Sequence, residues 1–246
     1  MIEGTFVVLE GIDGAGTSTQ AELLRAHFAS RGLPAIVTRE PTGGPVGSLI
    51  RLALTHRFVV PGVGGSRAPN WKTMALLFAA DRLDHLEAEI VPNLLDGVSV
   101  ISDRYDLSSL AYQSATSEDD VDPVETLAWL RALNRHARRP DLTIIVDVPA
   151  GVAEQRRRRR GAAVELYEHE ALQARLADAY RDARRLVPGD VLHHVDGNRP
   201  VDVVAADIAA AGLKSTKTGV TFSPSQPIPE KLVEKLALAS RQEHDL

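Results

Sequence analysis

A glycine-rich turn lies between a strand-like run and a helix-like segment near the start of the chain. The run Phe6–Glu10 is short, apolar and β-branched, which predicts a buried strand, and residues 18–30 have the apolar spacing of a helix. The turn Gly11–Gly16 and the two residues after it match the spacing of a phosphate-binding loop (P-loop) at every fixed position except one. Glycines let successive backbone N–H groups point at phosphate oxygens, and the next helix adds its positive end. A glycine-rich turn without a ligand is the alternative, and its place between a strand and a helix argues against it.

The exception is the lysine position of the P-loop, which Thr17 occupies. That lysine normally reaches the β and γ phosphates and offsets the developing charge. The next residue, Ser18, stands where the motif places the hydroxyl that binds Mg²⁺. A run of five arginines follows a later strand: Arg156, Arg157, Arg158, Arg159 and Arg160. Because arginine clamps phosphate bidentately, we interpret the run as a phosphate clamp that replaces the lysine. The alternatives are a solvated helix face and, more weakly, an RNA-binding patch, since no aromatic residues are interleaved with the run.

Strand-like and helix-like segments alternate along most of the chain. Strands are expected over residues 6–10, 35–38, 98–101, 142–147 and 191–195, and helices over residues 18–30, 74–95, 172–186 and 201–211. The alternation predicts a three-layer α/β fold of the P-loop NTPase type, in which a mainly parallel sheet of about five strands is flanked by helices. Ligands bind at the carboxyl ends of the strands in such sheets. Glu10-Gly11, Arg39-Glu40 and Asp103-Arg104 all fall at these expected ends.

Composition excludes several classes of protein. The formal net charge of −5 and the pI of about 5.9 argue against generic binding to duplex DNA. There are no cysteines, so disulfides and zinc–thiolate sites are excluded. No run of about 18 apolar residues is present, and a strand-like run follows Met1–Glu3 at once, which leaves no room for a signal peptide. We therefore expect a cytoplasmic protein that binds neither nucleic acid nor membrane.

Five motifs give the chain a resemblance to the thymidylate kinase family. They are LEGIDGAG at 9–16, TREP at 38–41, LFAADR at 77–82, DRY at 103–105 with SSLAYQ at 108–113, and PDLT at 140–143. The match covers roughly residues 4–211, and the motifs are specific in combination because they follow the family's order. The resemblance implies transfer of the γ-phosphate of ATP to dTMP, which gives dTDP and ADP in the synthesis of dTTP. It also implies Mg²⁺ as the cofactor and a homodimer as the assembly.

The acceptor half of the implied site is intact. Arg39 and Arg104 resemble the clamp on the acceptor phosphate, and two guanidiniums at neighbouring strand ends can hold a dianion in line with the donor. Phe78 and Arg82 share a helix face and resemble the ring that stacks on thymine and the arginine that bonds its O4. The remaining implied acceptor residues are Ser109 and Gln113 at the base edge, Tyr112 against the sugar 2′ position and Asp13 near the 3′-hydroxyl. Glu40-Pro41 is similar to a family turn that often carries a cis peptide bond.

The donor half of the implied site departs from the family pattern. The residues implied to bind ATP are Gly11, Ile12, Asp13, Gly14, Ala15, Gly16, Thr17, Ser18 and Thr19, and the metal residues are Ser18 and Asp103. Residues 196–200 resemble a loop near the donor adenine. Besides Thr17, residues 165–168 read Glu-Leu-Tyr-Glu where many members carry an acid, an arginine, an aromatic residue and glutamate. A kinase for another, modified deoxynucleoside monophosphate and a catalytically silent nucleotide-binding scaffold therefore remain as alternatives.

The resemblance also divides the chain. Residues 1–211 are expected to form one P-loop nucleoside monophosphate kinase domain, with a mobile lid at about 150–170. Residues 61–69 are rich in glycine and proline, and they predict a flexible loop inserted into that domain. Residues 212–246 are expected to form a linker and a short helix appended to it.

Overall fold

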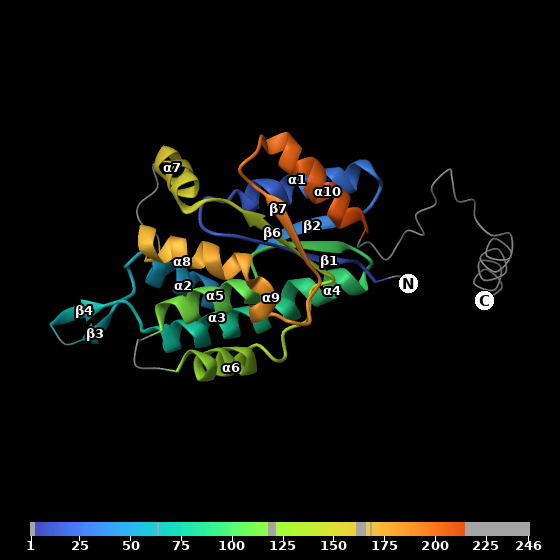
Figure 1. The fold of residues 1–246 in the computed structure, drawn as a ribbon. Coiled ribbons are helices and arrows are strands. Elements are labelled where there is room, and N and C mark those ends of the chain that lie inside the picture. Colours follow the sequence, from blue (N-terminus) through green and yellow to red (C-terminus); the bar gives the residue numbers. More distant parts are fainter. Residues whose placement is uncertain (1–2, 63, 118–121, 161–165, 168, 215–246) are drawn as a thin grey trace, which may run out of the picture. The chain divides into compact units, whose positions relative to one another are not determined.

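The computed structural model of the chain describes residues 3–62, 64–117, 122–160, 166–167 and 169–214 (Figure 1). Within these residues, no helix combines the length and the apolar character that crossing a membrane requires.

A five-stranded parallel sheet forms the centre of the described domain. Its strands lie in the order β2 (Ala35–Arg39), β5 (Ser99–Asp103), β1 (Phe6–Glu10), β6 (Leu142–Asp147) and β7 (Leu192–Asp196). All residues of β1 and β5 are buried, as expected for parallel strands covered on both faces. The predicted α/β fold with about five parallel strands is confirmed. Three strands differ from their expected bounds by one or two residues, because β2 ends at Arg39, β5 runs from Ser99 to Asp103, and β7 runs from Leu192 to Asp196.

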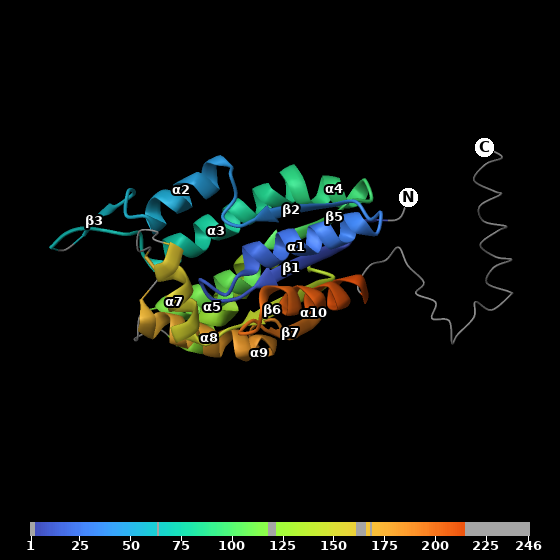
Figure 2. The same cartoon turned by 90° about the horizontal axis from the view of Figure 1, so that it is seen from above.

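Helices cover both faces of this sheet (Figures 1 and 2). Two helices, α1 (Thr17–Ser30) and α10 (Val201–Lys214), pack together on one face. On the other face lie α3 (Trp71–His85), α5 (Asp106–Thr116), α8 (Glu170–Arg181) and the shorter α4 (Val91–Leu95) and α9 (Ala183–Leu186). The helix α2 (Pro45–Leu54) packs on α3, α6 (Pro123–Leu133) packs on α5, and α7 (Ala150–Arg160) follows β6. The sequence interpretation did not identify α2, α5 or α6.

Alternation along β1 divides the core between two clusters. Phe6 and Val8 pack with Leu86, Ile90 and Leu94, whereas Val7 and Leu9 belong to the larger cluster that includes Leu24 and Phe28 of α1. Successive side chains of a strand point to opposite faces, so Phe6 and Val8 meet η1 (Leu86–Ile90) and α4 on one face while Val7 and Leu9 point to the other face. The larger cluster also takes in residues of α3, α5 and α8, so both faces of the sheet are covered. This double covering holds the carboxyl ends of β1, β2 and β5 rigidly beside one another.

The helix expected over residues 74–95 is longer and is interrupted. It begins at Trp71, because Asn70 caps it by accepting a hydrogen bond of 2.8 Å from the Thr73 N–H. A π-helical turn, η1 (Leu86–Ile90), then separates α3 from α4. The cause is Pro92 in the first turn of α4, since proline has no N–H and its ring clashes with the carbonyl four residues earlier.

The loop predicted over residues 61–69 is partly wrong. Val60–Gly62 (β3) and Gly65–Arg67 (β4) pair as an antiparallel hairpin, in which Val60 is the register partner of Arg67. Gly64 and Gly65 have φ of 86° and 137°, a conformation that tight turns require and glycine tolerates. At the other end of the domain, α10 includes residues 212–214 of the expected tail. Residues 215–246 and part of the expected lid lie outside the described residues.

Candidate functional site

The P-loop joins the buried end of β1 to the first turn of α1. Gly14 and Gly16 have φ of 92° and 100°, so the loop needs glycine at both positions. A Cβ on Gly14 would lie 2.5 Å from the carbonyl oxygen of Ala153, which shows that α7 packs directly on the loop. Thr17, at the lysine position, is buried in the first turn of α1. Thr17 therefore supplies no positive charge, and the short hydroxyl side chain cannot extend as a lysine would.

Two of the five arginines of α7 contact the P-loop backbone. Arg156 donates from Nη1 to the carbonyl of Ala15 at 3.2 Å and from Nη2 to the carbonyl of Gly197 at 2.9 Å. Arg157 donates to the carbonyl of Asp13. Arg158 instead forms an ion pair with Glu154, and its side chain is 78% exposed. Arg159 is exposed and the side chain of Arg160 lies outside the described part, so the structure divides the arginine run by position.

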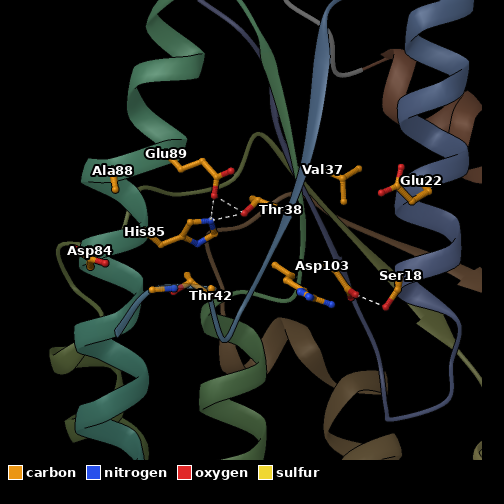
Figure 3. A pocket seen from close by; sticks show the side chains of 13 residues that line it. Ser18, Glu22, Val37, Thr38, Thr42, Asp84, His85, Ala88, Glu89 and Asp103 are labelled. Carbon is orange, nitrogen blue, oxygen red and sulfur yellow. Dashed lines mark hydrogen bonds and ion pairs between the residues drawn. The ribbon is translucent and has the colours of Figure 1, made fainter. Parts of the chain in front are cut away.

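A carboxylate and a hydroxyl meet at the start of α1. The Ser18 hydroxyl donates to Asp103 Oδ2, and the other carboxylate oxygen, Oδ1, is buried without a hydrogen-bond partner in the described structure. Both residues line a cavity of about 680 Å³ at the β2 side of the sheet (Figure 3). Oxygen ligands of this kind suit a hard divalent cation. Among the described residues no group of three or more His, Asp or Glu side chains could hold a metal. A cation at Ser18 and Asp103 would therefore take its other ligands from water and phosphate.

The implied acceptor residues line a second, narrower cavity of about 120 Å³. The members that the sequence predicted are Asp13, Phe78, Arg82, Arg104, Ser109, Tyr112 and Gln113. Small-molecule sites usually measure about 300–1,000 Å³, so this cavity accommodates part of a nucleotide rather than all of it. The described residues thus bring together every predicted acceptor residue except Arg39. We call it the acceptor pocket.

Arg39 lies in the larger cavity instead. It is exposed at the end of β2, where its register partner in β5 is Asp103. The backbone arrangement matches the prediction, because Arg39 and Arg104 follow neighbouring strands. The side chain of Arg39 lies near Ser18 and Asp103, whereas Arg104 lies in the acceptor pocket. The peptide bond between Glu40 and Pro41, which lies between Arg39 and α2 in the sequence, is cis.

Arg82 is a buried cation with three protein partners. Its Nη2 donates to Glu40 Oε2 at 2.6 Å and to Ser109 Oγ at 2.9 Å, and its Nη1 donates to Asn134 Oδ1. Its Nε is buried without a partner in the described structure, as is Oε1 of Gln113. Unpartnered buried polar atoms are costly and rare, so each calls for an explanation. A ligand in the acceptor pocket that offers both an acceptor and a donor would satisfy them.

Arg104 adopts an unusual backbone conformation at the entrance to α5. Its φ of 76° lies in the left-handed region, which non-glycine residues seldom occupy. Its Nη2 pairs with Asp13 Oδ1 at 2.6 Å, and its Nη1 donates to Ser108 Oγ at 3.1 Å. The guanidinium also lies over the Tyr112 ring, 5.4 Å from the centroid. Strained backbone that persists at a cavity is typical of functional positions.

Glu10, which the sequence placed at a strand end without giving it a role, supports Arg104 from below. Its Oε1 accepts hydrogen bonds from the N–H groups of Tyr105 at 2.9 Å and Ser108 at 3.1 Å. Its Oε2 accepts from the hydroxyls of Ser108 at 2.6 Å and Tyr180 at 3.1 Å. Burial raises the pKa of Glu10 to about 7. The available signal was an acidic residue in an otherwise apolar strand.

Gln173 of α8 was given no role by the sequence either. Its Oε1 accepts from the Asp13 N–H at 3.2 Å, and its Nε2 donates to Asp13 Oδ2 at 3.0 Å and to the carbonyl of Tyr167 at 2.7 Å. The fully buried Gln173 thus joins the P-loop to residue 167, whose ring lines the acceptor pocket. Its spacing from Leu176 and Tyr180 placed a polar side chain on the apolar face of the helix, and that pattern was the signal.

Comparison with known proteins agrees with this geometry. The family model described as thymidylate kinase matches residues 9–208. The chain belongs to the thymidylate kinase family. It is 37% identical to a probable thymidylate kinase of Pyrococcus horikoshii over 85% of this chain and 96% of that protein. Against a probable thymidylate kinase of Thermococcus gammatolerans it is 38% identical over 88% and 100%. Against a thymidylate kinase of Dinoroseobacter shibae it is 39% identical over 84% and 95%.

Membership of the thymidylate kinase family confirms the resemblance that the five motifs gave. It supports the assignment of the chain as a nucleotide-binding phosphotransferase of the dTMP kinase type, rather than the alternatives. The match covers residues 9–208 and therefore includes the P-loop with Thr17.

Proposed function

We propose that the chain transfers the γ-phosphoryl group of ATP to dTMP, with the acceptor base held in the narrow pocket between α3 and α5. The observation that carries this assignment is the pair of unpartnered buried atoms, Arg82 Nε and Gln113 Oε1. Thymine presents carbonyl acceptors next to its N3–H donor. A carbonyl therefore fits the Arg82 Nε–H, and the N3–H fits the Gln113 oxygen. Phe78, which lines the same pocket, offers a ring for stacking.

At the phosphate end, we assign the acceptor dianion to Arg104, with Arg39 approaching from the neighbouring cavity. Arg104 is already oriented by Asp13 and Ser108, so little ordering is needed when phosphate arrives. Asp13 forms an ion pair with Arg104, so the acceptor phosphate competes with Asp13 for the guanidinium. Asp13 is also placed to meet the sugar hydroxyl. Tyr112 narrows the pocket beside it and favours a deoxyribose.

For the donor, we assign the metal Mg²⁺ to Ser18 and Asp103. The orphaned Oδ1 of Asp103 and the adjacent hydroxyl fit such a cation. When bound, Mg²⁺ neutralises charge on the β and γ phosphates. The loop Gly11–Ser18 binds the phosphates through backbone N–H groups at the start of α1. Residues Ile12, Ala15 and Thr19 contribute only as part of this loop and its first helical turn.

We further assign the charge of the absent lysine to the arginines of α7. Arg156 and Arg157 support this assignment because they already contact carbonyls of the P-loop. Arg158, Arg159 and Arg160 follow them at the end of the helix. The assignment explains how a P-loop with Thr17 can stabilise a transferring phosphoryl group.

A coupled assay with Mg-ATP and a panel of nucleoside monophosphates tests the function. We expect dTMP to be the preferred acceptor and ADP formation to depend on it. A modified deoxyuridylate that reacts faster than dTMP would favour the alternative of a kinase for a modified deoxynucleoside monophosphate. Binding of dTMP with no diphosphate formed with any donor or metal would instead identify a catalytically silent scaffold.

A further inference from the structure

A line of buried polar side chains connects the acceptor pocket to the larger cavity at the edge of β2. It starts at Arg82, whose Nη2 donates to Glu40 Oε2 at 2.6 Å. The other oxygen of that carboxylate, Oε1, lies 3.3 Å from Nδ1 of His85. On the far side of the ring, His85 Nε2 lies 2.7 Å from Thr38 Oγ1 and 3.3 Å from Glu89 Oε2 (Figure 3). Each of these side chains except Glu89 is buried.

His85 joins the two ends of this line. Thr38 donates its hydroxyl proton to Glu89 at 2.7 Å, and its oxygen also meets His85 Nε2. The Glu40 carboxylate pairs with the Arg82 guanidinium through one oxygen and meets His85 Nδ1 through the other. His85 therefore bridges Glu40 and Thr38 through its two ring nitrogens, which point in opposite directions. The charged groups around it are Glu40 and Arg82 on one side and Glu89 on the other, with Arg39 and Asp84 lining the cavity that it faces.

Glu40 in turn determines where the Arg82 guanidinium lies. Arg82 is the base-contacting cation of the proposed function, and its buried charge depends on the Glu40 carboxylate for pairing. A carboxylate carried by two methylene groups can rotate, so a second hydrogen bond to Oε1 holds its plane. His85 supplies that bond without itself lining the acceptor pocket.

We propose that His85 is a positioning residue, which holds Glu40 and thereby aims Arg82 at the 4-oxo group of the acceptor base. The line is anchored at its outer end by Thr38 and Glu89. This inference rests on the proposed function, because it gives a role in base recognition to a residue that touches neither substrate. Nothing in the P-loop or in the arginine run takes part in it.

The substitution His85→Gln tests the proposal, because the single amide group of glutamine cannot bridge Glu40 and Thr38 as the two ring nitrogens of histidine do. We expect the KM for dTMP to rise about tenfold, as for loss of one hydrogen bond to a charged group, with kcat and the KM for ATP within about twofold of the native values. We also expect the preference for dTMP over dCMP, which carries an amino group in place of the 4-oxo group, to fall. A residue that only stabilises the fold would leave that preference unchanged.

A second pair of variants keeps the test decisive if His85→Gln does not fold. Glu89→Gln weakens the outer anchor at a side chain that is 44% exposed, and Glu87→Gln is the matched control on the same helical turn, exposed and outside the line. We expect the KM for dTMP to rise about threefold in Glu89→Gln, an estimate at the weak end for one hydrogen bond, and to stay unchanged in Glu87→Gln. The proposal is overturned if the variants change kcat or the KM for ATP as much as the KM for dTMP, or if the base preference does not move. Lack of dTMP phosphorylation by the native chain would instead count against the proposed function.

Discussion

Individual side chains at this site are each oriented by several hydrogen-bond partners. Arg104 is oriented by Asp13 on one side and by Ser108 on the other, and Ser108 in turn rests on Glu10. Glu10, to which the sequence gave no role, thus lies beneath Arg104, to which a motif gave one. Contacts between residues about a hundred positions apart cannot be read from local patterns, which is why the sequence assigned a role to Arg104 and none to Glu10.

The buried carboxyl of Glu10 makes stability depend on pH. Burial raises its pKa from 4.5 to about 7, so the folded state keeps a proton that the unfolded state releases. Retention of this proton contributes about 3 kcal/mol to the free energy of unfolding. The contribution is fully present below about pH 4.5 and is lost as the pH rises to about 7. Glu10→Gln mimics the protonated carboxyl. We expect the free energy of unfolding of this variant, measured with denaturant at several pH values between about 4.5 and 7, to fall less steeply with rising pH than that of the native chain. Equal slopes would contradict the assignment.

The metal assignment is also tested at one residue. Asp103→Asn removes the charge but keeps the size of the side chain, and its single amide oxygen can still accept from the Ser18 hydroxyl. We expect the Mg²⁺ concentration needed for half-maximal rate to rise about tenfold to a hundredfold, because a neutral amide is a weaker ligand for a hard cation. Titration of the rate with Mg²⁺ measures this. An unchanged Mg²⁺ requirement would place the metal elsewhere.

At the level of elements, the sequence predicted the parts whose pattern is local and strong. The strands at 6–10 and 142–147 and the helix after the P-loop were found because their apolar periodicity is clear. The hairpin β3–β4 was missed, because glycine and proline dominate strands of three residues that are stabilised only by pairing. The cavities were not predictable either, since which of them receives Arg39 depends on side-chain direction at the sheet edge.

The arginines of α7 should contribute unequally to kcat, depending on their position along the helix. Its first turns pack on the P-loop through Ala153, Arg156 and Arg157, whereas Arg158 faces solvent and pairs with Glu154. We expect Arg157→Ala to lower kcat about a hundredfold, as for loss of one charge-stabilising donor. Arg158→Ala is the matched control, and an exposed ion pair contributes little, so kcat should stay within about twofold. Steady-state rates at saturating ATP and dTMP measure both.

Two other results would count against this division of the helix. Similar losses in both variants would mean that the whole run closes over the donor. Unchanged turnover in all five single substitutions, Arg156→Ala to Arg160→Ala, would remove the arginines from the reaction altogether. The charge that replaces the lysine would then have to come from outside α7.

At the level of the whole molecule, the exposed face of α3 is a candidate surface for the homodimer that the family resemblance implies. Leu76 and Leu83 lie seven residues apart, which places them on one side of the helix, and they are 51% and 42% exposed. Leu52 of the neighbouring α2 is exposed as well. Apolar side chains gathered on a helix face commonly mark an association surface. The buried face of the same helix carries Arg82, so association through α3 would stiffen the acceptor pocket in each copy.

Charges placed on this face test the assembly. We expect the native chain to sediment as a dimer and the variant Leu76→Asp/Leu83→Asp to sediment as a monomer at the same concentration, because two buried carboxylates without partners oppose association. Leu95→Asp is the control, since Leu95 is 59% exposed but lies on α4. If the acceptor pocket is stiffened by association, the KM for dTMP rises in the monomeric variant while its melting temperature stays near that of the control. A native chain that is a monomer at micromolar concentration, or a control that dissociates equally, would show that α3 is not the interface.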